Sequence, residues 1–258
     1  MTRYHRQVTF APFGEQGQRR LAGSRVLICG CGALGGSVAA ILARAGVGFL
    51  RLLDDDIVTF DNLHRQFLFN ESDAKSQSPK VIAATRVLQA ANSTVIIEPV
   101  CRRLTSENGH DLIADVDLLI DGTDNFPSRF VLNDLVLSCG KPLVSGGVSG
   151  TSGQVLTVLP GHTPCLECVF DPALALTGAN HSVTNLNAAF PVLSPVVQVI
   201  SALQSMEAIK ILSGNIDQVS RAMHTFDLWN NRVRQFPLEH LVRERCPRCR
   251  KSEPTASG

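Results

Sequence analysis

The sequence has no excess of charge of either sign, few aromatic residues and no long apolar run. Its formal net charge is +1 and aromatic residues make up 5% of the chain, so nothing predicts a nucleic acid or an anionic membrane as a partner. No apolar run reaches the roughly 20 residues that span a bilayer, and the segment Met1–Arg6 lacks a signal-peptide core. We therefore expect a cytoplasmic protein that binds neither nucleic acid nor membrane.

What the chain does have is a glycine-rich turn between two short apolar segments. The pattern predicts a strand, a turn, a helix and a second strand, at Val26–Cys29, Gly30–Gly35, Ser37–Ala45 and Phe49–Leu53. This unit holds nucleotide phosphates on backbone N–H groups at the start of its helix. By itself it predicts a nucleotide and does not say which one.

Strands and helices alternate along the rest of the chain. Strands are predicted at Val95–Val100, Val116–Ile120, Pro142–Ser145, Gln154–Leu159, Ala222–Leu228 and Arg232–Leu238, and helices at Pro79–Ala91, Ser106–Ala114, Phe126–Ser138 and Pro195–Leu212. We expect flexible segments at Gly146–Gly153 and Asp171–Ala189. The pattern predicts an α/β fold with a Rossmann-like, mostly parallel central sheet, helices on both faces and additional C-terminal strands.

Polar residues gather after the second predicted strand. Between large apolar residues, the segment 57–69 carries Asp61, Asn62, His64, Arg65 and Gln66. Loops at the carboxyl ends of such strands are where ligands bind. Lys80 begins the next predicted helix, where its ammonium group would either meet a phosphate or be solvated.

A second polar cluster follows the predicted strand Val116–Ile120. A carboxylate at the end of a central strand, beside a phosphate site, is a natural magnesium ligand, and Asp121 and Asp124 both lie there. Asp124 or Asn125 could instead cap the helix that Pro127 opens. The sequence leaves both interpretations open.

Four of the eight cysteines form two CxxC pairs, Cys165 with Cys168 and Cys246 with Cys249. Two such pairs suit a structural zinc site, because four thiolates leave no open position for a substrate. The metal would link the C-terminal part to the middle of the chain; redox activity of the pairs is the alternative. Cys31 lies in the glycine turn, where we favour packing as a small apolar residue over a reactive thiol.

Together these stretches resemble the MoeB/ThiF group, bacterial relatives of the adenylation domain of ubiquitin-activating enzymes. The resemblance runs from about Arg3 to Cys249, with eight elements in the order of that group. A lone glycine motif would be a weak signal. Besides the glycine turn and the two CxxC pairs, the matching stretches are Arg3–Gln7, Leu52–Asp56, Asn62–Gln66, Pro79–Lys80, Asp121–Asn125 and Gln204–Lys210.

The resemblance implies carboxylate activation. In this group, the C-terminal glycine carboxylate of a small ubiquitin-like sulfur-carrier protein ending in Gly-Gly attacks the α-phosphate of ATP, which gives an acyl adenylate and pyrophosphate. The chain is thus expected to be an adenylyltransferase that uses ATP and Mg²⁺, contains structural Zn²⁺ and forms a homodimer.

The same resemblance assigns roles to individual residues. Arg65 and Lys80 would contact the phosphates from within the subunit, and Asp124 would hold Mg²⁺. Arg6 would reach across the homodimer into the neighbouring site, whereas residue type alone predicts a solvated arm. Asp54 would accept hydrogen bonds from the ribose hydroxyls. The expected nucleotide-binding set is Gly30, Gly32, Ala33, Gly35, Asp54, Asp56, Asn62, Arg65, Gln66, Lys80 and Asp124.

The chain departs from the group in two places. Ala33 stands where glycine is common, which would put a methyl group near the triphosphate. No cysteine lies between Cys168 and Cys246, whereas ThiF and the ubiquitin-activating enzymes capture the activated carrier on a cysteine in or beyond this region. We therefore predict adenylation without a covalent enzyme thioester. The alternatives are adenylation of a peptide C-terminus in a natural-product pathway, and a nicotinamide-dependent oxidoreductase or non-catalytic nucleotide-binding module.

We expect a single domain over residues 1–250. Within it, residues 1–24 form an N-terminal arm, residues 25–160 the nucleotide-binding core, and residues 161–250 a zinc-linked part that binds the carrier. Residues 251–258 are polar and expected to be a disordered tail.

Overall fold

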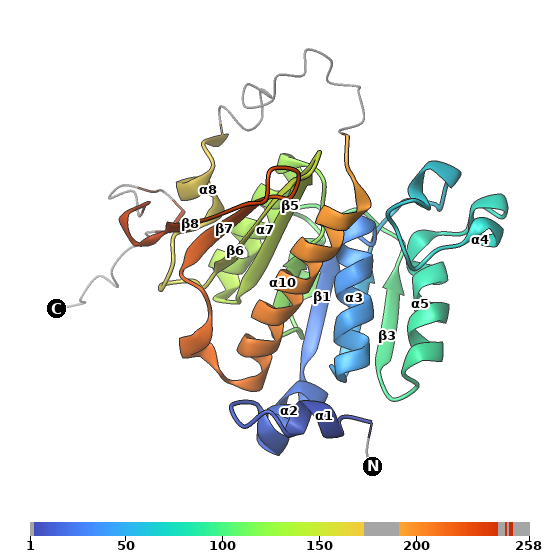
Figure 1. Cartoon of the computed structure of the whole chain (residues 1–258), viewed down its shortest axis with the longest axis horizontal. Coiled ribbons are helices and arrows are strands. Elements are labelled where there is room, and N and C mark those ends of the chain that lie inside the picture. Colours follow the sequence, from blue (N-terminus) through green and yellow to red (C-terminus); the bar gives the residue numbers. More distant parts are fainter. Residues whose placement is uncertain (1–2, 173–190, 242–245, 247, 250–258) are drawn as a thin grey trace.

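An eight-stranded sheet forms the centre of the computed structural model, which describes residues 3–172, 191–241, 246, 248 and 249. The strand order is β3-β2-β1-β4-β5-β6-β7-β8 (Figure 1). The first five strands of this order are parallel, and β6, β7 and β8 are antiparallel. The strands are β1 Arg25–Cys29, β2 Phe49–Leu53, β3 Ile96–Val100, β4 Leu118–Asp121, β5 Leu143–Ser149, β6 Ser152–Val158, β7 Ala222–Asp227 and β8 Arg232–Pro237.

Helices cover both faces of the sheet, as predicted (Figure 1). α3, α5 and α10 pack on one face, and α6 and α7 pack on the other. The α-helices are α1 His5–Val8, α2 Gly14–Gly23, α3 Ala33–Ala45, α4 Glu71–Lys75, α5 Lys80–Ala91, α6 Gly109–Ile113, α7 Phe126–Cys139, α8 Leu166–Val169 and α10 Ser194–Ser213, and the 3-10 helices are η1 Phe60–Asn62, η2 Ile216–Gln218 and η3 Glu239–Leu241.

The central strands are apolar along their whole length because both of their faces are buried. In β1, Ile28 faces the core under α3 and α10, and Leu27 faces the core under α7. In β4, Ile120 likewise faces the core under α3 and α10, and Leu119 faces the core under α7. Such continuous apolar strands are typical of parallel sheets with helices on both sides, and the α/β prediction is confirmed.

The prediction of a flexible segment at Gly146–Gly153 is wrong, because these residues belong to the hairpin of β5 and β6. Gly146 and Gly147 lie where side chains cross the strand closely. A Cβ on Gly146 would be 2.5 Å from the side chain of Gln204, and one on Gly147 would be 3.1 Å from Arg129 Nη1. These glycines therefore permit close packing and do not indicate mobility.

Two predicted helices differ in length from the observed ones by four residues, and the others by one or two. α3 begins at Ala33, four residues before the predicted start, because the last part of the glycine motif is already helical. α6 covers only Gly109–Ile113 of the predicted segment. Most of the predicted mobile loop and the predicted tail lie outside the described residues.

α10 is long and apolar enough to cross a bilayer by length and composition alone. In the structure it packs against α2, α3, β5 and β6, and 56% of its apolar window is buried. Its fully buried Gln204 donates hydrogen bonds to the carbonyl oxygens of Asp121 (2.8 Å) and Val144 (3.3 Å). α10 is therefore a core helix that fastens β4 to β5.

Candidate functional site

The glycine turn lies at the carboxyl end of β1, where the order of the strands reverses. β1 has both β2 and β4 as neighbours. The helix after β1, α3, covers one face of the sheet, and the helix after β4, α7, covers the other. Ligands of open α/β sheets bind in the crevice at such a switch point, so the fold places the turn in a ligand-binding position.

The backbone of the turn leaves the start of α3 open. Gly30 has a φ of +86°, which glycine adopts without strain. A Cβ on Gly35 would overlap the carbonyl oxygen of Gly30, so only glycine allows α3 to start this close to β1. Gly32 is the N-cap residue, and it has no side chain that could accept a hydrogen bond from the first N–H groups of α3. The first N–H groups of α3 can therefore bind an anion.

Ala33 is the first residue of α3, and its side chain packs against an apolar cluster at the start of α10. The cluster contains Val196, Val197 and Ile200. This methyl group, which the sequence predicted to lie near the triphosphate, therefore packs against apolar side chains.

Asp54 joins the end of β2 to the glycine turn. Its Oδ2 accepts a hydrogen bond from the N–H of Cys31 (2.6 Å), and its Oδ1 accepts one from the N–H of Asp56 (2.8 Å). Burial raises the pKa of the Asp54 carboxyl above its usual value. Each oxygen keeps a further lone pair, which suits a ribose hydroxyl above the turn.

Lys80 is buried, in contrast to the solvated lysine that a helix position usually implies. Its side chain is 8% exposed, and its Nζ forms an ion pair with Asp56 Oδ2 at 2.7 Å. The backbone N–H of Lys80 also donates to the carbonyl oxygen of Asp56 (2.9 Å). This double contact fixes the start of α5 beside the loop that follows β2.

The loop after β2 brings two amides and a guanidinium to the same edge of the sheet. Asn62 is buried, and its Oδ1 accepts from the N–H of Thr59 (3.4 Å). Gln66 is buried with Nε2 3.7 Å from a Cβ position on Gly32, and its Oε1 has no hydrogen-bond partner. Arg65 is half-buried, and its Nη1 donates to the carbonyl oxygen of Asp61 (2.7 Å).

The two interpretations of Asp124 and Asn125 are separated by the structure. Asn125 caps α7, because its Oδ1 accepts from the N–H of Ser128 (3.0 Å). The Asp124 carboxylate is exposed and accepts a hydrogen bond from Asn125 Nδ2 (3.2 Å). Asp124 lines a groove of about 470 Å³ with Arg129 of α7 and with residues of β5–β8, including Gln154, Asp227, Arg232 and Arg234.

A buried polar network beneath this groove was not found by the sequence analysis. The carboxylate of Asp121 is fully buried, accepts from Ser145 Oγ (2.6 Å) and Thr123 Oγ1 (2.7 Å), and lies 3.4 Å from Arg129 Nε. Arg129 also donates to the carbonyl oxygen of Gly146 (2.9 Å). Asp121 is thus used within the protein, whereas the carboxylates of Asp124 and Asp227 belong to residues that line the groove.

Arg6 is not part of this group of residues within one chain. It is exposed on α1, which lies with α2 at the end of the molecule from which β1 starts (Figure 1). Gln7 Nε2 donates to the carbonyl oxygen of Ala45 at the end of α3 (3.0 Å). The 13 residues of α3 separate that point from the glycine turn by about 20 Å.

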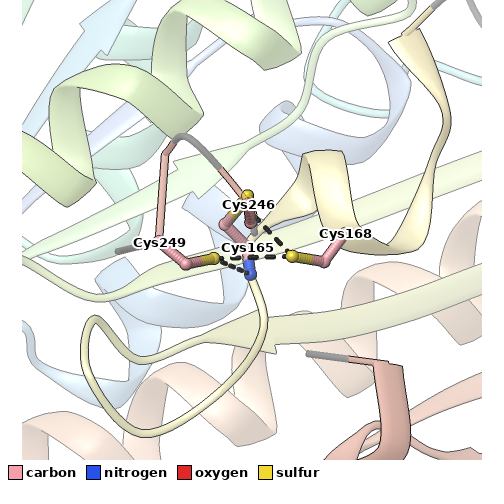
Figure 2. Close-up of side chains that lie close together, drawn as sticks. All are labelled: Cys165, Cys168, Cys246 and Cys249. Atoms are coloured by element: carbon pink, nitrogen blue, oxygen red, sulfur yellow. Dashed lines mark hydrogen bonds between the residues drawn. The ribbon is translucent and has the colours of Figure 1, made fainter. Parts of the chain in front are cut away.

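The four paired cysteines come together, as the spacing predicted (Figure 2). The Sγ–Sγ distances are 3.8 Å for Cys165 and Cys246, 3.5 Å for Cys168 and Cys249, and 4.0 Å for Cys165 and Cys168. A tetrahedral Zn²⁺ with Zn–S bonds of 2.3 Å requires about 3.8 Å between sulfurs. Burial raises the pKa of the Cys165 thiol, and a bound cation would favour its thiolate form. The donor set fits zinc.

Cys31 is a packing residue, as the sequence analysis favoured. It is fully buried, and burial raises the pKa of its thiol well above the usual value. Cys29 at the end of β1 behaves in the same way. Neither thiol is available as a nucleophile at neutral pH.

Comparison with known proteins places the chain in a family. The model of the ThiF family matches residues 4–248. The sulfur carrier protein ThiS adenylyltransferase of Bacillus subtilis is 38% identical over 247 residues, covering 96% of this chain and 71% of that protein. A sulfur carrier protein adenylyltransferase of Thermus thermophilus is 36% identical over 260 residues, covering 99% and 92% of the two chains.

Other relatives are longer or more distant. The adenylyltransferase and sulfurtransferase MOCS3 of Xenopus laevis is 36% identical over 255 residues, and the chain spans about half (54%) of its length. A solved structure of E. coli MccB with succinimide has a TM-score of 0.80 at 22% identity, covering 92% of this chain and 72% of that one. The MccB likeness supports the fold alone.

The fold suits nucleotide binding, and the relatives identify the chain as an enzyme of the adenylyltransferase class. The chain belongs to the ThiF family.

Proposed function

We propose that this chain catalyses the ATP-dependent adenylation of the C-terminal glycine carboxylate of a small ubiquitin-like sulfur-carrier protein. The observation that carries the proposal is the open N-terminus of α3 at the glycine turn, with Lys80 and Asp54 fixed beside it. The names of the relatives from Bacillus subtilis and Thermus thermophilus supply the substrate class. We place the protein in the cytoplasm.

In the proposed reaction, a carboxylate oxygen of the carrier attacks the α-phosphorus of ATP. The bond from that phosphorus to the bridging oxygen breaks, and pyrophosphate leaves with the electron pair. No general base is required, because a terminal carboxyl group is ionised at neutral pH. The protein therefore has to position the two reactants and stabilise negative charge on the phosphates.

Residues at the carboxyl edge of the sheet would supply these two functions. The N–H groups of α3 bind phosphate oxygens, and the guanidinium of Arg65 neutralises charge that develops on pyrophosphate. Lys80, held by Asp56 at 2.7 Å, adds a second cation with little freedom to move. Asn62 and Gln66 orient the phosphates or the attacking carboxylate, and the unpartnered Oε1 of Gln66 remains available for a donor.

Asp124 would hold the Mg²⁺ that accompanies ATP. Its carboxylate is exposed beside the groove, and carboxylate oxygens are the ligands that this ion prefers. Bound there, Mg²⁺ would neutralise charge on the phosphate oxygens. The groove between Asp124 and the β7–β8 hairpin would receive the C-terminal tail of the carrier.

Arg6 would complete the site of the neighbouring subunit in a homodimer. The arm that carries Arg6 is attached to the far end of α3, so the side chain does not reach the glycine turn of its own chain. An arginine supplied by a neighbour can still stabilise charge on transferred phosphates.

The activated carrier would leave as a free acyl adenylate. No cysteine lies between Cys168 and Cys246 in the sequence, and Cys29 and Cys31 are buried with raised thiol pKa values. We propose that the four paired cysteines hold structural zinc and are not used for capture. Mass spectrometry of enzyme, ATP and carrier should show no covalent adduct, and a thiol-sensitive adduct would contradict this step.

ATP–pyrophosphate exchange tests the proposed reaction directly. We expect exchange that depends on a carrier ending in Gly-Gly and that disappears when the last glycine is removed from the carrier. Exchange with peptides ending in Asn or Asp, and none with any carrier, would assign the chain to peptide adenylation instead. Absence of exchange with both would favour a nucleotide-binding module or a nicotinamide-dependent enzyme.

Metal analysis tests the cysteine cluster separately. We expect one zinc per chain that is retained through gel filtration. Less than one equivalent of zinc per chain, with the thiols of Cys165, Cys168, Cys246 and Cys249 all free to react, would refute the zinc site.

A further inference from the structure

The segment that carries Arg6 is fastened to the body of its own subunit by side chains that the proposed reaction does not use. We propose that Tyr4, Gln7 and Asn92 are positioning residues that hold α1 so that Arg6 is presented to the neighbouring subunit. The inference rests on the proposed function, because it assumes that Arg6 acts in that neighbouring site.

Tyr4 docks against the end of α3. Its hydroxyl oxygen accepts a hydrogen bond from Asn92 Nδ2 at 2.8 Å. Asn92 is fully buried, and the same Nδ2 donates to the carbonyl oxygen of Ala43 at 2.7 Å. The tyrosine ring covers Gly46, where a Cβ would lie 2.5 Å from the ring. Tyr4 thus fills a position that is shaped for it by a glycine and a buried amide.

Gln7 makes the second attachment. Its Nε2 donates to Gln18 Oε1 (2.8 Å) and to the carbonyl oxygen of Ala45 (3.0 Å). Gln18, on α2, donates to the same Ala45 carbonyl oxygen (3.1 Å). The last carbonyls of a helix have no partner within the helix, so these amides satisfy the end of α3 and fix α1 against it.

These attachments determine where Arg6 points. α1 has only four residues, too few to be stable as an isolated helix, so its conformation depends on the contacts of Tyr4 and Gln7. Tyr4 and Gln7 are three residues apart and share a face, and both are half-buried. Arg6, between them in the sequence, is exposed.

The arrangement also connects two active sites through one helix. The N-terminus of α3 forms the phosphate turn of its own subunit, and its C-terminus holds the arm given to the other subunit. The position of Arg6 in one site is therefore set by the same rigid helix that cradles phosphates in the other.

Mixed dimers test the positioning role. A chain with Lys80→Ala has a disabled site but still provides Arg6, and a chain with Arg6→Ala has an intact site but provides no arginine. Each variant alone should be inactive in carrier-dependent ATP–pyrophosphate exchange. An equal mixture should recover activity from the one complete site of each mixed dimer.

The attachment is then removed from one chain at a time. Adding Tyr4→Ala and Gln7→Ala to the Lys80→Ala chain should lower the recovered activity at least tenfold, because that chain provides the arginine. The same two changes in the Arg6→Ala chain should leave the recovered activity unchanged. Tyr4→Phe in place of Tyr4→Ala should restore part of the activity, because the ring still covers Gly46 while the hydrogen bond from Asn92 is lost. Equal losses in both arrangements would mean that the residues act only on stability, and would overturn the proposal.

Failure of the mixture itself has a separate meaning. If the parent variants do not complement each other while the wild-type protein is active with the carrier, Arg6 does not act across subunits and the positioning proposal falls. The proposed carrier adenylation would stand in that case, because it rests on exchange by the wild-type protein.

A measurement that does not depend on activity is also possible, because Tyr4 is the single tyrosine of the chain. Protein labelled with 3-fluorotyrosine should give one ¹⁹F resonance. Gln7→Ala should move this resonance toward its position in the unfolded chain, whereas the control Gln235→Ala on exposed β8 should not. An unchanged resonance in Gln7→Ala would contradict the proposed attachment.

Discussion

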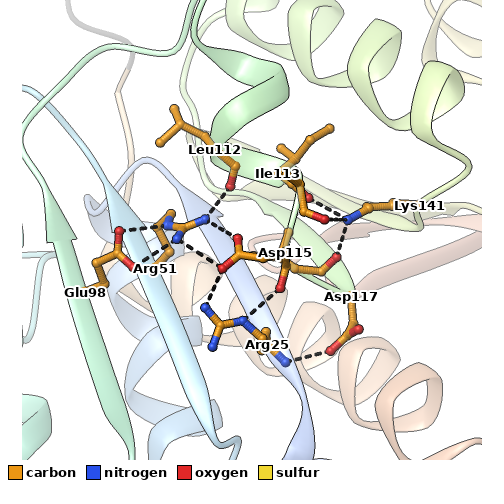
Figure 3. Close-up of polar contacts among 10 residues, drawn as sticks. Arg25, Arg51, Glu98, Leu112, Ile113, Asp115, Asp117 and Lys141 are labelled. Carbon is orange, nitrogen blue, oxygen red and sulfur yellow. Dashed lines mark hydrogen bonds and ion pairs between the residues drawn. The ribbon is translucent and has the colours of Figure 1, made fainter.

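Charged side chains near the amino ends of the parallel strands are paired within the chain, whereas several polar groups at the carboxyl ends have few partners there. Toward the amino ends, Arg51 pairs with Glu98 at 2.9 Å and with Asp115 at 2.7 Å, and Arg25 pairs with Asp115 at 2.6 Å (Figure 3). Lys141 there donates to three backbone carbonyl oxygens at 2.6 to 2.8 Å. The guanidinium and carboxylate groups thus pair with one another, and the Lys141 ammonium group satisfies backbone carbonyl oxygens at the end of α6 and before β4.

At the carboxyl ends, several polar groups have little to bind within the chain. Arg65 donates to a neighbouring carbonyl oxygen, Asp124 accepts from the adjacent Asn125, and Gln66 Oε1 has no partner. Leaving the buried Gln66 Oε1 without a partner costs stability, so its retention at this edge favours a bound ligand there. The comparison separates residues kept for the fold from residues kept for a ligand, and each prediction below tests that separation.

The largest effect is expected for Arg65→Ala. Removing this cation should lower carrier-dependent exchange by about 10²- to 10³-fold, because the stabilisation of developing phosphate charge is lost. The melting temperature should stay close to that of the wild type, since Arg65 is half-buried and its hydrogen bonds are to the nearby Asp61 carbonyl oxygen and His64 ring. Arg19→Ala, which removes an exposed arginine of α2, is the control. Retention of full activity in Arg65→Ala would show that the carboxyl edge has been misinterpreted.

Gly35→Ala should damage both function and stability. The new methyl group would overlap the carbonyl oxygen of Gly30, so α3 must move away from β1 at a cost of about 3 kcal/mol. Denaturant unfolding measures the stability loss, and calorimetric titration with ATP measures binding. Gly23→Ala serves as a control, since nothing lies within 4 Å of its Cβ position. Wild-type stability in Gly35→Ala would contradict the close contact.

Arg51→Met should affect stability alone. The Arg51 side chain is 10% exposed, and its loss removes charge-assisted hydrogen bonds to Glu98 and Asp115 at a cost of about 2 kcal/mol in unfolding free energy. Both carboxylates are partly exposed, so water replaces some of the lost contacts. Exchange activity per folded molecule should not change. Arg44→Met on the exposed side of α3 is the control. A tenfold loss of activity in Arg51→Met would contradict the assignment of Arg51 to the fold alone.

The smallest effect is expected from acid titration of Asp115. Hydrogen bonds from Arg51, followed by those from Arg25, lower the pKa of Asp115 to about 2. A lowered folded-state pKa gives stability that is present above the unfolded-state value near 3.8 and is lost as the pH falls toward 2. Because the side chain is 48% exposed, the contribution should be below about 1 kcal/mol.

Urea unfolding at pH 5 and pH 3 measures this contribution. Asp115→Asn should lower the unfolding free energy at pH 5 and bring it closer to the wild-type value at pH 3. Asp111→Asn, on the exposed surface of α6, should leave the difference between the two pH values unchanged. An identical pH dependence for Asp115→Asn and the wild type would exclude Asp115 as its source.

Most of the fold could be predicted because its signals are local. The apolar segment before Gly30, the glycine spacing and the next strand at Phe49–Leu53 determine the first unit without reference to distant residues. The spacing of the cysteine pairs likewise predicted a cluster that the structure brings together across about 80 residues. Predictions from local periodicity and from cysteine spacing hold in the structure because the tertiary contacts agree with these local signals.

The groove and its supporting network could not be predicted in the same way. Asp121, Arg129 and Gln204 come from β4, α7 and α10, and only the folded sheet brings them together. Gln204 carried a usable signal, since a glutamine within an apolar helix needs buried partners. Gly146 and Gly147 were misinterpreted for the related reason that a glycine in the sequence does not show which side chain crosses it.

The exposure of β8 has a consequence for the behaviour of the protein at high concentration. All six of its residues are exposed, including Val233 and Phe236, and it is the last strand of the sheet. Within the described part of the chain no strand pairs with the outer edge of β8, and such an edge favours pairing with another molecule. Two arginines and the closing Pro237 oppose such pairing, because like charges repel and proline offers no N–H group. Salt screens that repulsion, so self-association through β8 should increase with ionic strength well before the folding free energy declines.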